Sequence, residues 1–195
     1  MRHSDLIVIG AGPAGMAAAA TAAGHGFSVT LLDEQPRPGG QIYRDVDRVA
    51  ARRGDILGAD YTYGSRLTTA LRHDNINHVS GAVVWAIEDG FRVSYTRDGA
   101  GAQVSGERIL LATGALERPM PVPGWTLPGV MTAGAAQILL KQSGVLARRA
   151  VLDGARARRV VGKVAAHRTD GCAGRIRRSC RCPRPASSSP ASRRR

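Results

Sequence analysis

Cysteine is absent from the first 147 residues of the chain, and the three cysteines, Cys172, Cys180 and Cys182, all lie in the last part. A disulfide framework therefore cannot support the first part, and a reduced, cytoplasmic setting is expected. Long apolar runs are absent as well, because no stretch approaches the roughly 20 residues of a membrane-spanning helix. Asp5, three glycines and Pro13 interrupt the apolar run near the N-terminus, which argues against a secretory signal.

Acidic and aromatic residues are scarce in the last part of the chain. Residues 1–147 carry 13 basic and 13 acidic residues, whereas residues 148–195 carry 15 basic and 2 acidic residues and account for the net charge of +13. Because no aromatic residue lies among these arginines, incidental charge is favoured over a basic nucleic-acid-binding module, which is kept as a third candidate function. The C-x7-C-x-C spacing of the cysteines does not match the paired spacing of structural zinc sites, so no metal site is predicted.

Apolar runs alternate with a helical pattern near the start of the chain. Residues 6–9 and 27–32 are predicted strands, and the alanine-rich stretch 13–23 between them is a predicted helix with proline at its first position. This strand-helix-strand order is the unit of a Rossmann-like α/β fold with a parallel sheet. Residues 82–95 predict a hairpin that would form an added small β-sheet, and residues 108–112 predict another buried strand.

The sequence divides into three parts. Residues 1–117 are expected to form the first segment of a dinucleotide-binding domain. Residues 118–147 follow as a proline-rich connector and a helix, 132–141, which would begin a second such domain. Residues 148–195 lack periodicity and end in Arg, Ser and Pro, so this basic tail is expected to be disordered. The predicted α/β fold is therefore incomplete.

A glycine motif, Gly10-Ala11-Gly12-Pro13-Ala14-Gly15, joins the first predicted strand to the helix. Gly10 permits a tight turn, Gly12 lets the backbone approach a pyrophosphate, and Gly15 allows the helix to pack closely on the strand. The N–H groups and the dipole at the helix start favour an anion there. Asp33 and Glu34 end the next strand, where an acid binds the ribose of FAD or NAD and an arginine would favour NADP.

Two stretches of sequence resemble one group of flavoproteins. VIGAGPAGMAAAATAAGHGFSVTLLDEQPRPGGQIYR is similar to flavoproteins with two dinucleotide-binding domains, of the pyridine nucleotide-disulfide oxidoreductase type, whose first glycine-rich loop holds the ADP half of FAD. It most resembles the FAD-binding subunits of the opine oxidase, hydrogen cyanide synthase and hydroxyproline dehydrogenase group, as does LLATGALERPMPVPGWTLPGVMTAGAAQILLK. The resemblance covers residues 4–147. It implies bound FAD, oxidation of an amino or imino acid or relay of its electrons, and a second oxidoreductase subunit.

The same resemblance assigns roles to individual residues. It implies no catalytic residue, and because no cysteine pair follows the Gly39-Gly40 turn it does not extend to disulfide reduction. For Arg37 and Val84, a solvated charge and a core strand explain the residue equally well. The implied contacts are Gly10, Gly12, Pro13, Ala14 and Gly15 with the pyrophosphate, Asp33 in preference to Glu34 with the adenosine ribose, Arg37, Gly40 and Gln41 with the ADP or flavin side, the Val84 backbone with adenine, and Ala112, Thr113 and Gly114 with the isoalloxazine edge.

The resemblance ends where these flavoproteins continue into a second glycine-rich loop. Residues 150–163 begin like the required strand, but Gly154 is followed by Ala-Arg-Ala-Arg-Arg instead of the loop. We expect that the reading frame was lost near residues 147–155, because out-of-frame GC-rich DNA encodes mainly Arg, Ala, Gly, Pro, Ser and Cys. A genuine short protein with a basic tail is the alternative. A nonfunctional or purely nucleotide-binding fragment is the competing candidate function.

Overall fold

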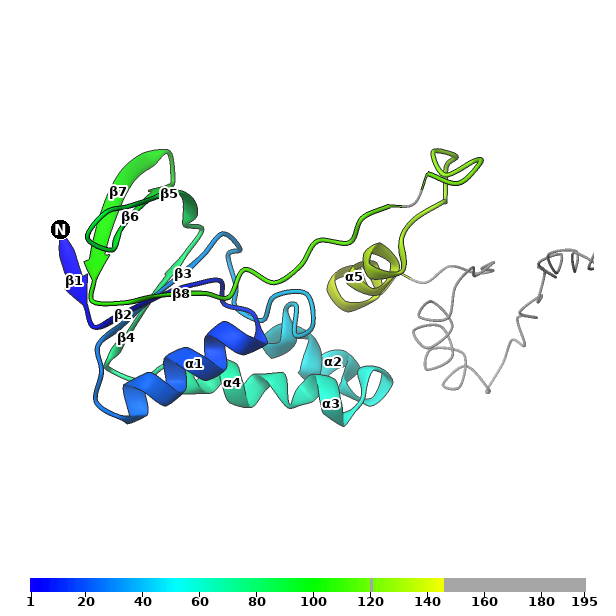
Figure 1. Cartoon of the computed structure of the whole chain (residues 1–195). Coiled ribbons are helices and arrows are strands. Elements are labelled where there is room, and N and C mark those ends of the chain that lie inside the picture. The colour runs from blue at the N-terminus through cyan, green and yellow to red at the C-terminus, as the bar shows by residue number, and fades with distance from the viewer. Residues whose placement is uncertain (120, 146–195) are drawn as a thin grey trace, which may run out of the picture.

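A parallel sheet forms the centre of the structure (Figure 1). The computed structural model describes residues 1–119 and 121–145. Within these residues the sheet has the strand order β4-β3-β2-β8, and Ile7 of β2 lies opposite Ile109 of β8. Two strands that are distant in the sequence are therefore direct neighbours. The strands are β2 (Leu6–Ile9), β3 (Val29–Asp33), β4 (Ile76–Ser80) and β8 (Ile109–Leu111).

Helix α1 (Pro13–Gly24) covers one face of this sheet. Its buried residues are small apart from Met16, so the helix lies close to the strands. Met16 packs with Val8 and Leu31 in a core that is closed to solvent. Helix α4 (Gly64–Ala70) lies beside α1 on the same face, as Figure 1 shows.

A second sheet, of order β1-β7-β6-β5, covers the opposite face. Ile7 and Ile9 pack there with Val93 and Val104 in a second core. Successive residues of β2 thus serve different cores, which explains why this strand is apolar throughout rather than alternating. The strands of the second sheet are β1 (Arg2–Ser4), β5 (Val83–Glu88), β6 (Arg92–Arg97) and β7 (Ala100–Gly106).

The remaining helices are α2 (Val46–Leu57), α3 (Ala59–Thr62) and α5 (Ala133–Ser143). Val46 and Tyr61 bury their side chains together where α2 meets α3. An extended segment leads from β8 to α5 (Figure 1), and α5 packs against α2. Thr132 caps the first turn of α5, whose C-terminal Gly144 adopts a left-handed conformation with φ 68°.

The α/β fold with a parallel sheet and an added small sheet is confirmed. The strand predicted at 27–32 begins two residues later and extends to Asp33, and the helix predicted at 132–141 extends to Ser143. The predicted hairpin is also present. The strand predicted at 108–112 forms at 109–111, but the expectation that it is buried is wrong, because β8 lies at the edge of the sheet and leaves Leu111 63% exposed. The expectations of a disordered tail and a lost reading frame fall outside the described residues.

Leu31 and Leu116 allow a matched test of the core. Replacing Leu31, which is 0% exposed, by alanine removes buried methylene groups and leaves a cavity beneath α1, so we expect a loss of about 2–5 kcal/mol in the free energy of unfolding. Leu116→Ala, at a side chain that is 94% exposed, should change it by less than about 0.5 kcal/mol. Urea denaturation of both variants measures the difference, and equal losses would contradict this packing.

Candidate functional site

The glycine-rich turn at the end of β2 is held between two other backbone segments. Gly10 has φ 105°, and a Cβ atom there would lie 2.4 Å from the carbonyl oxygen of Ala112. At Gly15 a Cβ atom would lie 1.8 Å from the carbonyl oxygen of Gly10. Both approaches are too short for any side chain, so only glycine permits β2, α1 and β8 to meet here.

Gly12 differs from these two glycines because a Cβ atom there would meet nothing within 4 Å. It is the N-cap of α1, and no side chain among the described residues caps the helix start. The first N–H groups of the helix, on Ala14 and Gly15, have no partner within the helix. A positive helix end without a side-chain cap, beside the open position at Gly12, suits the pyrophosphate of a dinucleotide.

Asp33 ends β3, directly beside this turn. One of its carboxylate oxygens accepts the N–H of Ala11 and the other accepts the N–H of Gln35 at 2.6 Å. A carboxylate offers about four lone-pair positions, so the oxygens can still accept ribose hydroxyls. Glu34 is exposed and accepts a hydrogen bond from the Gln35 side chain. Of the two acids, only Asp33 contacts the glycine-rich turn.

The segment Ala112–Gly114 follows β8 and borders the same turn. The Ala112 N–H donates to the carbonyl of Ile9 at 2.8 Å, and Thr113 and Gly114 are exposed. The Gln41 side chain donates to the carbonyl of Ala115 at 3.1 Å. Residues 39–42, which we name the Gly-Gly turn, thus reach the segment that was predicted to pass the flavin.

The Gly-Gly turn also contacts the glycine-rich turn. The Gly39 N–H donates to the carbonyl of Ala11 at 2.8 Å. A Cβ atom on Gly40, whose φ is 57°, would lie 2.9 Å from the Cα of Gly12. The structure therefore brings the predicted site residues of three chain segments together at the carboxyl ends of β2, β3 and β8, the edge at which parallel α/β sheets bind ligands.

Arg37 and Val84 are less closely associated with this edge. Arg37 pairs with the buried carboxylate of Asp45, which also pairs with Arg48. Val84 packs its side chain against the second core, while the nearby Ala82 N–H donates to the carbonyl of Asp33. Their contacts with a ligand stay predictions.

Sequence reasoning missed Tyr43 and Lys141. A Cβ atom on Gly64 would lie 2.4 Å from the ring of Tyr43. The ring therefore packs directly against the first residue of α4. Lys141 is only 5% exposed and donates to the carbonyls of Gln41 and Ile42 at 3.1 and 2.7 Å. An aromatic residue three positions after the Gly39-Gly40 pair was a usable sequence signal for Tyr43. A single lysine in a predicted helix carries no such signal for Lys141.

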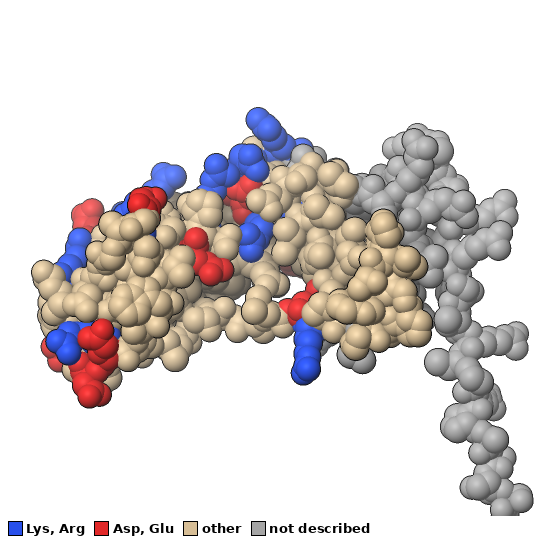
Figure 2. All heavy atoms as spheres, turned by 90° about the horizontal axis from the view of Figure 1, so that it is seen from above, with Lys and Arg blue, Asp and Glu red and all other residues tan. Residues whose placement is uncertain are grey.

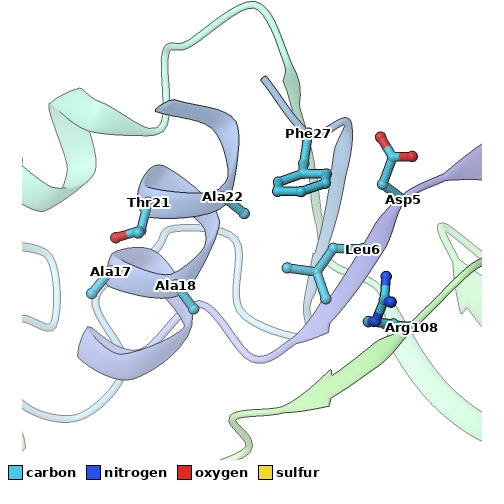
Figure 3. Close-up of a pocket in the computed structure, with 8 residues that line it drawn as sticks. All are labelled: Asp5, Leu6, Ala17, Ala18, Thr21, Ala22, Phe27 and Arg108. Atoms are coloured by element: carbon cyan, nitrogen blue, oxygen red, sulfur yellow. The ribbon is translucent and has the colours of Figure 1, made fainter. Parts of the chain in front are cut away.

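A separate hollow lies along the flank of α1 (Figure 3). Leu6, Phe27 and Arg108 line it, together with alanines of the helix. These three residues stand at the amino ends of β2, β3 and β8, or just before them. The hollow is therefore at the opposite edge of the sheet from the glycine-rich turn and belongs to a different surface.

In the view of Figure 2, acidic and basic side chains are intermingled over the described residues.

Within residues 1–119 and 121–145 no group of three or more His, Cys, Asp or Glu side chains could hold a metal ion. In the same part of the chain, every helix is too short or too polar to cross a bilayer.

A glycine-rich turn, a free helix start, an acid after the second strand and a parallel sheet together define a Rossmann-type dinucleotide-binding domain. Residues 4–157 match the pyridine nucleotide-disulphide oxidoreductase family, and the chain belongs to this family. The resemblance inferred from the two sequence stretches is thereby confirmed.

Known relatives are longer than this chain. The A subunit of opine oxidase from Agrobacterium tumefaciens (strain Ach5) is 52% identical over 150 residues, which cover 73% of this chain and 30% of that protein. The HcnB subunit of hydrogen cyanide synthase from Pseudomonas protegens is 39% identical over 149 residues, with 72% and 30% coverage. The L-proline dehydrogenase from P. horikoshii shares the fold, with a TM-score of 0.70 and 22% identity over 83% of this chain and 33% of that one. The chain thus spans about 30% of the length of these curated relatives.

The two kinds of glycine in the motif should respond differently to alanine. Gly15→Ala forces a methyl group against the Gly10 backbone, so we expect a loss of about 2 kcal/mol or more in the free energy of unfolding. Gly12→Ala meets open space and should change it by less than about 1 kcal/mol. Thermal and urea unfolding of the two variants would contradict the arrangement if Gly12→Ala were the more damaging.

The Asp45 ion pairs predict a pH dependence of stability. Burial alone would raise the pKa of Asp45, but hydrogen bonds and the positive charges of Arg37 and Arg48 outweigh it and lower that pKa below its ordinary value. The stabilisation is therefore complete above about pH 5 and lost as the pH falls through the folded-state pKa. Asp45→Asn should cost about 1 kcal/mol at pH 7, because the arginines are half exposed, and little at pH 2. Asparagine tolerates the φ of 61° at this position. A loss that does not vary with pH would contradict the role of the charge.

Proposed function

We propose that the glycine-rich turn binds the ADP half of FAD. The observation that carries this proposal is the contrast between Gly10 and Gly15, which are closed against backbone, and Gly12, which faces open space at the start of α1. Pro13 and Ala14 complete the turn around the pyrophosphate. Asp33 accepts the hydroxyls of the adenosine ribose, a role for which its contact with the Ala11 N–H positions it better than Glu34.

The flavin end of the cofactor extends along the other two segments of the site. The Gly-Gly turn packs on the glycine-rich turn through Gly40 and is bonded through Gln41 to Ala115, the residue that follows the segment Ala112–Gly114. Bound FAD supplies the two-electron redox chemistry, whereas the protein contributes binding, orientation and exclusion of water. No residue of this chain is assigned as a catalytic acid or base.

The names of three similar proteins support a substrate class. They include the opine oxidase relative, the alpha chain of sarcosine oxidase and an L-proline dehydrogenase. Opines, sarcosine and proline are all amino acids with a secondary amine, so the full activity is oxidation of such amino or imino acids or relay of their electrons. Several relatives are named as subunits, which supports partnership with a second oxidoreductase subunit. A reduced, cytoplasmic setting fits this chemistry.

The second candidate function is nucleotide binding without turnover. It is supported by the site itself, since the glycine-rich turn and Asp33 suit a nucleotide, whereas no described residue is assigned as a catalytic acid or base. Anaerobic addition of a secondary-amine amino acid to one sample of the FAD-loaded full chain, and of dithionite to a second sample, separates the two. Chemical reduction with no reduction by substrate, in the presence of the partner subunit, would support binding alone.

Titration of FAD into the full chain, followed by flavin fluorescence, tests the site. We expect saturable binding near one FAD per chain. Asp33→Asn should weaken it about tenfold or more, because a hydrogen bond to a charged acceptor is lost, whereas the matched variant Glu34→Gln should leave it within about twofold. Gly12→Ala should remove binding while the chain stays folded, since its methyl group occupies the space of the pyrophosphate. No binding by the unaltered chain, or equal effects of the two acid variants, would overturn the proposal.

A further inference from the structure

Helix α5 is bonded to the Gly-Gly turn through one buried side chain, that of Lys141. Lys141 lies 100 residues beyond Gln41, and its Nζ donates to the Gln41 carbonyl at 3.1 Å and to the Ile42 carbonyl at 2.7 Å. The same ammonium lies 5.7 Å from the centre of the Tyr61 ring, within range of a cation–π interaction. Two successive backbone carbonyls therefore point at one positive charge.

Burying an ammonium group is costly, so its position requires a compensating interaction. Lys141 is 5% exposed, and burial, helped by the nearby charge of Arg44, lowers its pKa to about 8. A methionine of similar length would fill the same space without this cost. The carbonyls of Gln41 and Ile42 are among the groups that compensate the cost of burying the lysine.

The two carbonyls belong to the Gly-Gly turn, which contacts the glycine-rich turn and Ala115. The turn is bonded to Ala11 through the Gly39 N–H, packs on Gly12 through Gly40, and reaches Ala115 through the Gln41 side chain. A restraint on the carbonyls at residues 41 and 42 therefore fixes the backbone from which the Gln41 side chain extends towards the segment after β8.

We propose that Lys141 is a positioning residue for the bound flavin cofactor, holding the Gly-Gly turn in the conformation that spans the glycine-rich turn and the segment Ala112–Gly114. The inference rests on the proposed FAD site and adds to it a residue outside the nucleotide-binding motif. Lys141 acts through the turn and needs no contact with the cofactor. Its role is therefore to restrict the turn before the cofactor arrives.

Lys141→Met in the full chain tests the proposal against Gln142→Met, which places the same side chain on the exposed face of the same helix. We expect Lys141→Met to weaken FAD binding about tenfold and to alter the visible circular dichroism of the bound flavin, because two hydrogen bonds from a charged donor are lost. The variant should stay folded, with a single cooperative transition in urea. Gln142→Met should change neither property.

Hydrogen exchange without FAD provides the second measurement. Lys141→Met should speed exchange of a peptide covering residues 39–43, where the Gly39 and Tyr43 N–H groups are bonded, and Gln142→Met should not. Unchanged affinity and unchanged exchange in Lys141→Met, or a loss of stability at unchanged affinity, would overturn the positioning role and leave the FAD site standing. Faster exchange in a chain that binds no FAD would instead overturn the proposed function, and with it the cofactor role of the restraint.

Discussion

The close approach of three backbone segments, at Gly10, Gly15 and Ala112, is the constraint on which the rest of the structure depends. Distances of this size leave no room for a side chain, so β2, α1 and β8 have one relative position. The start of α1 therefore has a fixed position at the carboxyl end of the sheet. Its first N–H groups, which have no partner within the helix, have a fixed direction. The packing that holds the helix on the sheet also prepares the anion-binding position.

The cores on the two faces of the parallel sheet maintain this arrangement. Val8 faces the core under α1, and Ile7 and Ile9 face the core under the second sheet. Because side chains alternate along a strand, a slip of one residue would exchange these sets and also turn Asp33 away from the face that it shares with Leu31. Register and site geometry are therefore determined together by apolar packing.

The parts of the fold that were predictable are those in which local chemistry and tertiary packing agree. The β2-α1-β3 unit combines an apolar run, a proline at the first helical position and an acid at the end of the second strand. These features predict a strand, a helix start and a strand end, respectively. Helix α2 gave no clear pattern, because it is charged and becomes helical around Val46 and Val49, whose partner Tyr61 lies in another helix. β7 contains two glycines, which disfavour a strand, and its pairing with β6 and β1 stabilises it instead. The motif identified the candidate site residues near the glycine-rich turn, but contacts across about 100 residues, such as that of Lys141, have no sequence period.

The hydrogen bond between the Ala112 N–H and the Ile9 carbonyl has a consequence for folding. It closes a loop of about one hundred residues, which contains α1, three strands of the second sheet and the helices between them. Such long-range pairings bear the largest loop-closure entropy and form late in folding. The β2-α1-β3 unit can assemble from local contacts before the edge strand β8 arrives. We therefore expect the candidate site to be completed late in folding, so that a ligand bound there would stabilise the last pairing of the sheet rather than the first.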